Sequence, residues 1–183
     1  MSRGLQTALV GALLLAALNT LGDFVWGRFV PAHRTVYGLL HGTLLLMAVG
    51  LYLGVLRGRA ALGALGGALV GLLAALSFYA LVRLIGMSAM FASWMALWIG
   101  FAFLDARLRG SAPPREALAR GVLAALGSGL AFWAVSGIWT RHDPGGPNYA
   151  YNFACWTLAF LPGFLALLLR DRPGPAIDTP TAR

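Results

Sequence analysis

The sequence predicts an all-α fold, a polytopic membrane helix bundle with six transmembrane helices. Hydrophobic residues make up 59% of the 183 residues, and the mean hydropathy is +0.75. Charged residues make up only 11%, whereas soluble domains carry about 25%. The charged residues also divide the chain into uncharged stretches of roughly 20 residues, the length that a helix needs to cross about 30 Å of hydrocarbon.

Each uncharged stretch is expected to be a helix, because lipid cannot satisfy open backbone groups. With a few charged residues included at their ends, the expected helices cover residues 5–26, 35–56, 60–82, 87–105, 116–140 and 149–169. Prolines, glycines and arginines mark the turns between them, at Pro31, Arg57-Gly58-Arg59, Gly86, 106–116 and 141–147. The sequence thus indicates one membrane domain over 1–170 and a disordered cytoplasmic tail over 171–183.

The basic residues predict the orientation. All 14 are arginine; with the N-terminus inside, ten fall in cytoplasmic segments and four on the other side. This bias predicts that both termini are cytoplasmic, and we expect an integral protein of a bacterial inner membrane. The net charge of +8 is therefore attributed to orientation. Nucleic-acid binding is not expected, since no aromatic residues are interleaved with a basic patch.

Small residues recur on one face of the third expected helix. Gly63, Gly67 and Gly71 are spaced by four residues, so they lie on one side of the helix. In lipid such a face lets two helices approach closely. We expect Gly67 to lie in a close helix contact, either within the bundle or in a homo-oligomer.

Polar residues within the expected spans suggest a polar path. Asn19 and Asp23 lie one turn apart in the first helix, and His41 lies about two turns into the second. Intramembrane polar groups can form the route of a small transporter or channel. The structural alternatives are an ion pair of Asp23 with Arg28 or Arg34, and a hydrogen bond from His41 to a neighbouring helix.

Complete catalytic and metal motifs are absent from the sequence. Cys155 is the only cysteine, the three histidines are isolated, and all six acids lie at expected helix ends, in loops or in the tail. Ser128 lies in Gly127-Ser128-Gly129 but lacks the wider nucleophile elbow. We therefore expect no catalytic residues, metal or cofactor, and favour a non-enzymatic protein, with an intramembrane lipid- or quinone-modifying enzyme as an alternative.

Two regions resemble the Insig family, including its bacterial-type members. The helix with Trp94 and Trp98 closes on Leu104-Asp105-Ala106-Arg107-Leu108-Arg109-Gly110, which is similar to the family's Phe-Asp-Arg-Ser-Arg-Ser-Gly. The aromatic-rich turn and closing helix are matched by Trp139, Pro144, Tyr149, Tyr151 and Trp156-Thr157-Leu158. The resemblance covers about residues 85–170 by pattern, and the first half by topology.

The resemblance implies a six-helix bundle that binds a diacylglycerol or a sterol-like lipid, in a family known for sterol sensing. It also implies that Asp105, with Arg107, contacts a membrane-protein partner. By spacing alone, Asp105 is expected to end its helix and to pair with Arg109 four residues later.

A lipid cavity is expected beside the last two helices. Glycines and serines leave gaps along the 116–140 helix, and Pro162 followed by Gly163 should bend the closing helix. The expected ligand-binding residues are Gly129, Trp133, Phe160, Pro162 and Gly163. The alternative is that large neighbours such as Trp133 and Phe160 fill this space.

Overall fold

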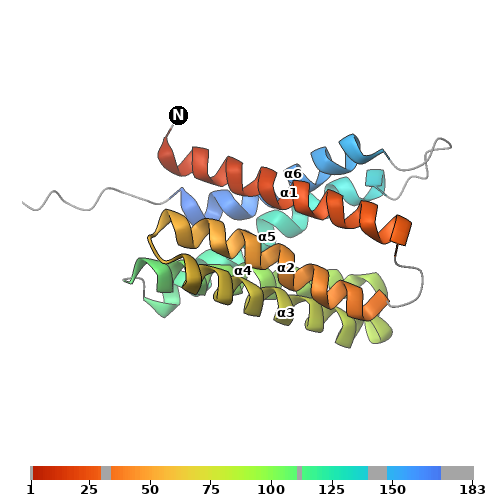
Figure 1. Ribbon diagram of the computed structural model, residues 1–183, viewed down its shortest axis with the longest axis horizontal. Coiled ribbons are helices and arrows are strands. Elements are labelled where there is room, and N and C mark those ends of the chain that lie inside the picture. The colour runs from red at the N-terminus through yellow and green to blue at the C-terminus, as the bar shows by residue number, and fades with distance from the viewer. Residues whose placement is uncertain (1, 30–33, 111–112, 140–147, 170–183) are drawn as a thin grey trace, which may run out of the picture.

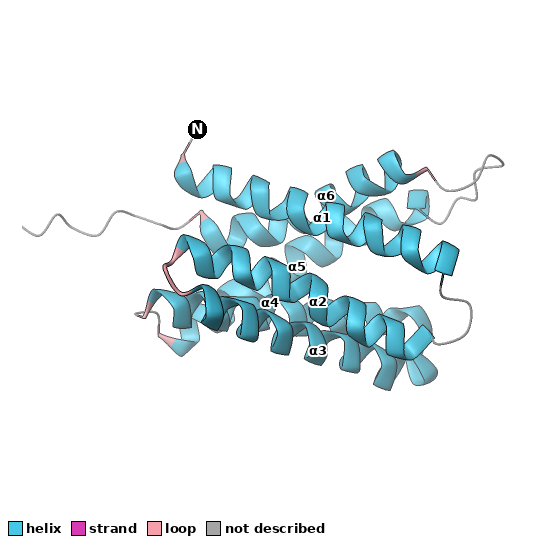
Figure 2. Ribbon diagram, in the orientation of Figure 1, coloured by secondary structure: helices cyan, strands magenta, loops and turns pink. Residues whose placement is uncertain are grey.

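The computed structural model describes residues 2–29, 34–110, 113–139 and 148–169. They form six α-helices and one short 3-10 helix; among these residues there is no strand (Figure 2). The elements are α1 (Arg3–Phe29), α2 (Arg34–Leu56), α3 (Ala60–Ile85), η1 (Gly86–Ser88), α4 (Ala89–Arg109), α5 (Pro114–Trp139) and α6 (Tyr149–Leu168). The all-α prediction is confirmed, while the predicted tail, 171–183, lies outside the described residues.

Five stretches of the described chain are long and apolar enough to cross a membrane. They are Gly4–Val25, Thr35–Leu56, Ala60–Arg109, Pro114–Val135 and Tyr149–Leu168. The third stretch has 50 residues and comprises α3, η1 and α4. Large apolar side chains such as Leu65 and Leu130 are exposed on the outer surface, as expected for a bundle that faces lipid. This is the architecture of an integral membrane protein.

Two glycines end helices later than the sequence predicts. Gly86 has φ +60° and caps α3, which therefore includes Arg83 in its last turn. Gly110 has φ +77°, and its N–H donates to the carbonyl of Ala106. Because glycine adopts this left-handed cap without strain, α4 continues one turn past Asp105. The prediction that Asp105 ends this helix is wrong.

The helices form a closed ring. Each α-helix contacts the next one along the chain, and α1 contacts α6. Neighbouring helices run in opposite directions, so the start of α1, the α2–α3 turn and the ends of α4 and α6 lie at one end of the bundle (Figure 1). Of these six contacts, the one between α1 and α2 is the least extensive.

The glycine face of α3 packs against α2. A Cβ atom at Gly67 would lie 2.2 Å from the carbonyl oxygen of Leu46 and 2.8 Å from the Cα of Gly50. Gly63 and Gly71 approach α2 in the same way. The expected close contact of Gly67 is confirmed. It lies within the chain, so this face is not available to a second copy.

Candidate functional site

A cavity of about 140 Å³ lies inside the ring, bounded by α1, α2, α3, α4 and α6. Most of its lining is aliphatic, aromatic or glycine. The lining side chains with polar groups are Asn19 from α1, His41 from α2 and Ser93 from α4, besides the indoles of two tryptophans. Ser93 donates its hydroxyl to the carbonyl of Ala74, at 2.8 Å. Asn19 and His41 are therefore the polar groups that face the cavity from the α1–α2 side.

Stacked rings form the opposite wall. Phe160 stacks on Trp94 with 5.1 Å between ring centroids, and on Trp156 with 5.4 Å. Phe132 supports the same two tryptophans from α5, at 5.2 Å and 5.8 Å. All four residues are buried. The cavity thus has a flat, rigid apolar wall, which suits a ring or an extended hydrocarbon chain.

A polar cluster joins α1, α2 and α6 at the end of the cavity. The indole Nε1–H of Trp156 donates to Asp23 Oδ2 at 2.9 Å. The hydroxyl of Tyr37 donates to the carbonyl of Gly22 at 3.0 Å, and the Tyr37 ring stacks on His41. His41 lies directly against α1, since a Cβ atom at Gly22 would fall 1.9 Å from its ring. Glycine at position 22 is what allows this contact.

The cavity is not sealed from the surface, and its α1–α2 side is lined by half-buried residues. Asn19 and His41 are half-buried, whereas Leu15, on the inner side of α1, is fully buried. Farther along the contact between α1 and α2, the hydroxyl of Tyr52 donates to the carbonyl of Thr7 at 3.2 Å. This contact, called the seam below, is therefore held near both ends by the hydrogen bonds of Tyr37 and Tyr52. It is the least extensive contact of the ring.

The structure brings together two sets of residues that the sequence analysis kept apart. Asn19 and His41 of the predicted polar path line the same cavity as Phe160 of the predicted lipid site. Asp23 joins them through Trp156. Within the described residues, this hydrogen bond takes the place of the expected ion pair of Asp23 with Arg28. In the sequence, Trp156 stands out only through the resemblance to the Insig family, and no local pattern predicts its hydrogen bond to Asp23.

The space predicted between α5 and α6 is filled at Gly127 and at Gly163. A Cβ atom at Gly163 would lie 2.2 Å from the Trp98 ring, and one at Gly127 would lie 3.3 Å from Pro162. The backbone N–H of Gly163 donates to the buried hydroxyl of Ser128 at 3.0 Å. A large side chain therefore fills the space beside Gly163. It is Trp98 of α4, and not Trp133 or Phe160 as the alternative from the sequence had it.

The other predicted ligand residues also lie away from the cavity. Gly129 is buried beside Phe91, and its Cβ position would be in ordinary contact, at 3.8 Å. Trp133 is 68% exposed on the outer surface of α5. Of the five residues predicted for the lipid site, only Phe160 lines the cavity described here.

No polar track leads on from the cavity through the described part of the bundle. The interior is packed with fully buried apolar side chains, among them Val49, Trp98, Phe101 and Phe164. The polar side chains buried in the described core are Asp105 and Ser128. Ser128 is engaged with α6, and Asp105 lies at the end of the bundle.

Asp105 is 3% exposed and is held by arginines. Its Oδ2 atom lies 2.7 Å from Arg109 Nε, and its Oδ1 atom lies 3.7 Å from an Arg57 nitrogen. The expected pair with Arg109 is confirmed. Arg107, predicted to act with Asp105 in partner binding, is exposed and lines a second pocket, separate from the cavity described above. The carboxylate of Asp105 is thus buried, whereas Arg107 lies at the surface.

Comparison with known proteins gives no evidence on function, so the evidence comes from the candidate site. No family model, curated protein or solved structure matches this chain. In the described residues, no group of three His, Cys, Asp or Glu side chains could hold a metal ion; His33 and His142 lie outside these residues. The cavity behind α1 and α2 is the feature whose chemistry bears on function.

Proposed function

We propose that this chain is a non-enzymatic membrane protein that binds a neutral lipid or a sterol-like molecule, as its resemblance to the Insig family implies. The observation that carries the proposal is the α1–α2 cavity, with stacked aromatic rings on one side and Asn19 and His41 on the other. A diacylglycerol or a sterol combines a hydroxyl with a large apolar body. The amide and imidazole suit the hydroxyl, and the rings suit the apolar part.

The volume sets how much of the ligand enters. A cavity of about 140 Å³ is close to one that holds a single benzene ring, and smaller than the roughly 300–1,000 Å³ of pockets for drug-sized ligands. It therefore holds one ring, or the hydroxyl-bearing end of a lipid. The rest of the ligand lies in the seam between α1 and α2 and in the surrounding bilayer.

A transporter is the less favoured alternative. It would need polar groups on both sides of the packed centre, and the described centre of the bundle is filled by fully buried apolar side chains such as Trp98 and Phe101. A mostly apolar cavity that is not sealed from the surface suits a lipid-binding site better.

We also propose six membrane crossings with both termini in the cytoplasm. The 50-residue stretch Ala60–Arg109 would be about 75 Å long as one helix, more than twice the roughly 30 Å of hydrocarbon. It is broken at Gly86, and α3 and α4 pack side by side. We therefore assign one membrane crossing to α3 and one to α4.

Cysteine labelling tests the topology in a Cys155→Ser background. Asn148→Cys, at the exposed start of α6, is expected to react with an impermeant maleimide on intact cells. Ser2→Cys, at the exposed start of α1, is expected to react only after permeabilisation. Both positions cap a helix, so the two variants are matched. The reverse labelling pattern would contradict the proposed orientation.

Photolabelling tests the lipid site. A photoactivatable diacylglycerol and a photoactivatable sterol are added separately to the full chain in phosphatidylcholine nanodiscs. Leu97→Trp replaces a leucine of the cavity wall with a larger, aromatic side chain, and Asn19→Leu removes the amide that lines the cavity. Leu97→Trp is expected to reduce labelling at least about fivefold, and Asn19→Leu about threefold to tenfold, the effect of one lost hydrogen bond.

Trp133→Leu is the control for this experiment. It removes a large ring from the lipid-facing surface of α5, outside the cavity, so labelling should stay at the wild-type level. Labelled peptides are expected from α1, α2 or α4. Labelling that falls with Trp133→Leu but is unchanged by both cavity variants would show that the lipids bind only at the outer surface.

A further inference from the structure

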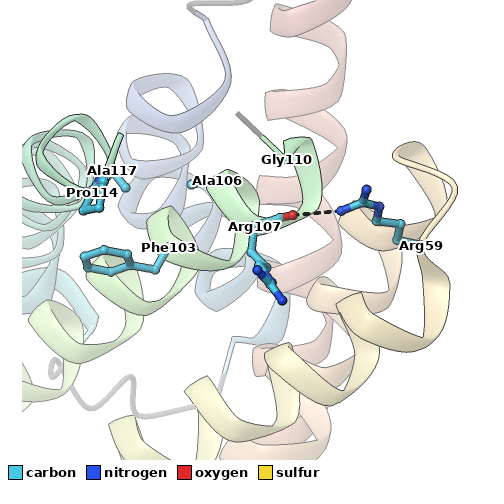
Figure 3. A pocket seen from close by; sticks show the side chains of 7 residues that line it. All are labelled: Arg59, Phe103, Ala106, Arg107, Gly110, Pro114 and Ala117. Carbon is cyan, nitrogen blue, oxygen red and sulfur yellow. Dashed lines mark hydrogen bonds between the residues drawn. The ribbon is translucent and has the colours of Figure 1, made fainter. Parts of the chain in front are cut away.

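A second pocket lies at the end of the bundle that holds the α2–α3 turn and the start of α5. Its volume is about 590 Å³, and it lies between the start of α3, the last two turns of α4 and the first turn of α5. Arg59 and Arg107 line one side of it, and Phe103, Pro114 and Ala117 line the other, with Ala106 between them (Figure 3). This pocket is separate from the cavity of the proposed function.

The two arginines of this pocket are not neutralised by acids. Within the described residues, the acids at this end pair elsewhere: Asp105 with Arg109 and Arg57, and Glu116 with Arg120 at 2.5 Å. No described carboxylate lies within 4 Å of Arg59 or Arg107, and both arginines are exposed. They carry positive charge that is available to an anion.

Arg59 is positioned by the helix it faces. Its Nη1–H donates to the backbone carbonyl of Arg107 at 3.0 Å, as the dashed line in Figure 3 shows. This bond caps the last turn of α4 and offsets the negative end of that helix. The pocket also faces the start of α5, whose first residue is Pro114 and whose dipole is positive at this end.

The opposite side of the pocket is apolar. Phe103 is 42% exposed and lies one turn before Arg107 on α4, toward the middle of the bundle. Together with Pro114 and Ala117 it forms a wall between α4 and α5. Arginines above an exposed apolar wall match the boundary between headgroups and hydrocarbon in a bilayer.

We propose that this pocket binds the phosphodiester of an anionic phospholipid with an uncharged headgroup, of the phosphatidylglycerol type. The phosphate lies between the guanidinium groups of Arg59 and Arg107, which bind phosphate through charge-assisted hydrogen bonds. The glycerol and the first part of an acyl chain lie on Phe103, Pro114 and Ala117. A choline headgroup is disfavoured, because its cation would approach two arginines. A free phosphate would leave the apolar wall unused.

Lipid titration monitored by native mass spectrometry tests the proposal on the delipidated full chain in detergent. Phosphatidylglycerol and phosphatidylcholine of the same acyl composition are compared, with inorganic phosphate and glycerol phosphate as soluble competitors. Phosphatidylglycerol is expected to bind at least about tenfold more tightly than phosphatidylcholine. Arg107→Gln is expected to weaken its binding about tenfold, the effect of a lost hydrogen bond to a charged group.

Two further variants separate a binding site from general surface charge. Arg115→Gln removes one positive charge at the same end but outside the pocket; it should change affinity less than about twofold, because salt screens exposed charges. Arg59→Lys keeps the charge but not the fork geometry, and is expected to weaken binding with little change in melting temperature.

The proposal is overturned if Arg107→Gln binds phosphatidylglycerol like the wild type, or if phosphatidylcholine binds equally well. It is also overturned if the soluble phosphates compete as effectively as the lipid, which would indicate a site for free anions. Photolabelling by diacylglycerol reports on the α1–α2 cavity, so the two proposals fail independently.

Discussion

Replacement of Gly67 with alanine is expected to destabilise the bundle by about 1–3 kcal/mol, and replacement with leucine by more. The added Cβ would lie 2.2 Å from the carbonyl oxygen of Leu46 and 2.8 Å from the Cα of Gly50. Both are backbone atoms, so no side-chain rotation can relieve the overlap, and α2 and α3 must move apart. The loss would extend along the whole glycine face, where Gly63 and Gly71 make similar approaches.

Gly129→Ala is the matched control. Gly129 is also a buried helical glycine, but its Cβ position is 3.8 Å from the nearest atom, in the Phe91 ring. The same change in helix propensity, about 1 kcal/mol in favour of alanine, applies to both variants. Thermal unfolding in detergent should show a lower melting temperature for Gly67→Ala and an equal or higher one for Gly129→Ala. If the Gly67→Ala and Gly129→Ala proteins had the same melting temperature, the close α2–α3 contact would be contradicted.

Asp105→Asn is expected to cost about 3 kcal/mol of unfolding free energy, the lower end of the range for removing one partner of a buried ion pair. The carboxylate is 3% exposed and lies 2.7 Å from Arg109 Nε. Arg57 approaches the same carboxylate from the α2–α3 turn. The variant leaves both guanidinium groups without this charge. They are partly exposed, so water offsets a share of the loss.

Glu116→Gln removes the acid of a similar pair, spaced by four residues on α5. The Glu116 side chain is 39% exposed, so its loss should cost about 0.3–0.5 kcal/mol. Chemical unfolding of the two variants in the same detergent measures the contrast. An Asp105→Asn protein as stable as Glu116→Gln would show that the Asp105 pair contributes little. If the contrast holds, any effect of Asp105 variants on a partner protein must first be corrected for stability.

The helices themselves could be predicted from the sequence, because their signal is local. Stretches of roughly 20 residues without charge are long enough to cross a bilayer, and lipid leaves the backbone no choice but internal hydrogen bonds. The glycine spacing in 60–82 likewise predicted the close contact of Gly67, and the spacing of Asp105 and Arg109 predicted their ion pair. The helix ends were less accurate, because the caps at Gly86 and Gly110 depend on backbone conformation.

Only the tertiary structure decided which side chains meet. In a membrane protein nearly every face of a helix is apolar, so hydrophobic periodicity does not mark the side that faces inward. The rotation of each helix depends on packing against neighbours distant in sequence. Trp98 of α4 fills the space beside Gly163 of α6, where part of a ligand cavity was expected. Gly22 lets His41 lie against α1, and so Asn19 and His41 share a cavity with Phe160, 119 residues farther along the chain than His41.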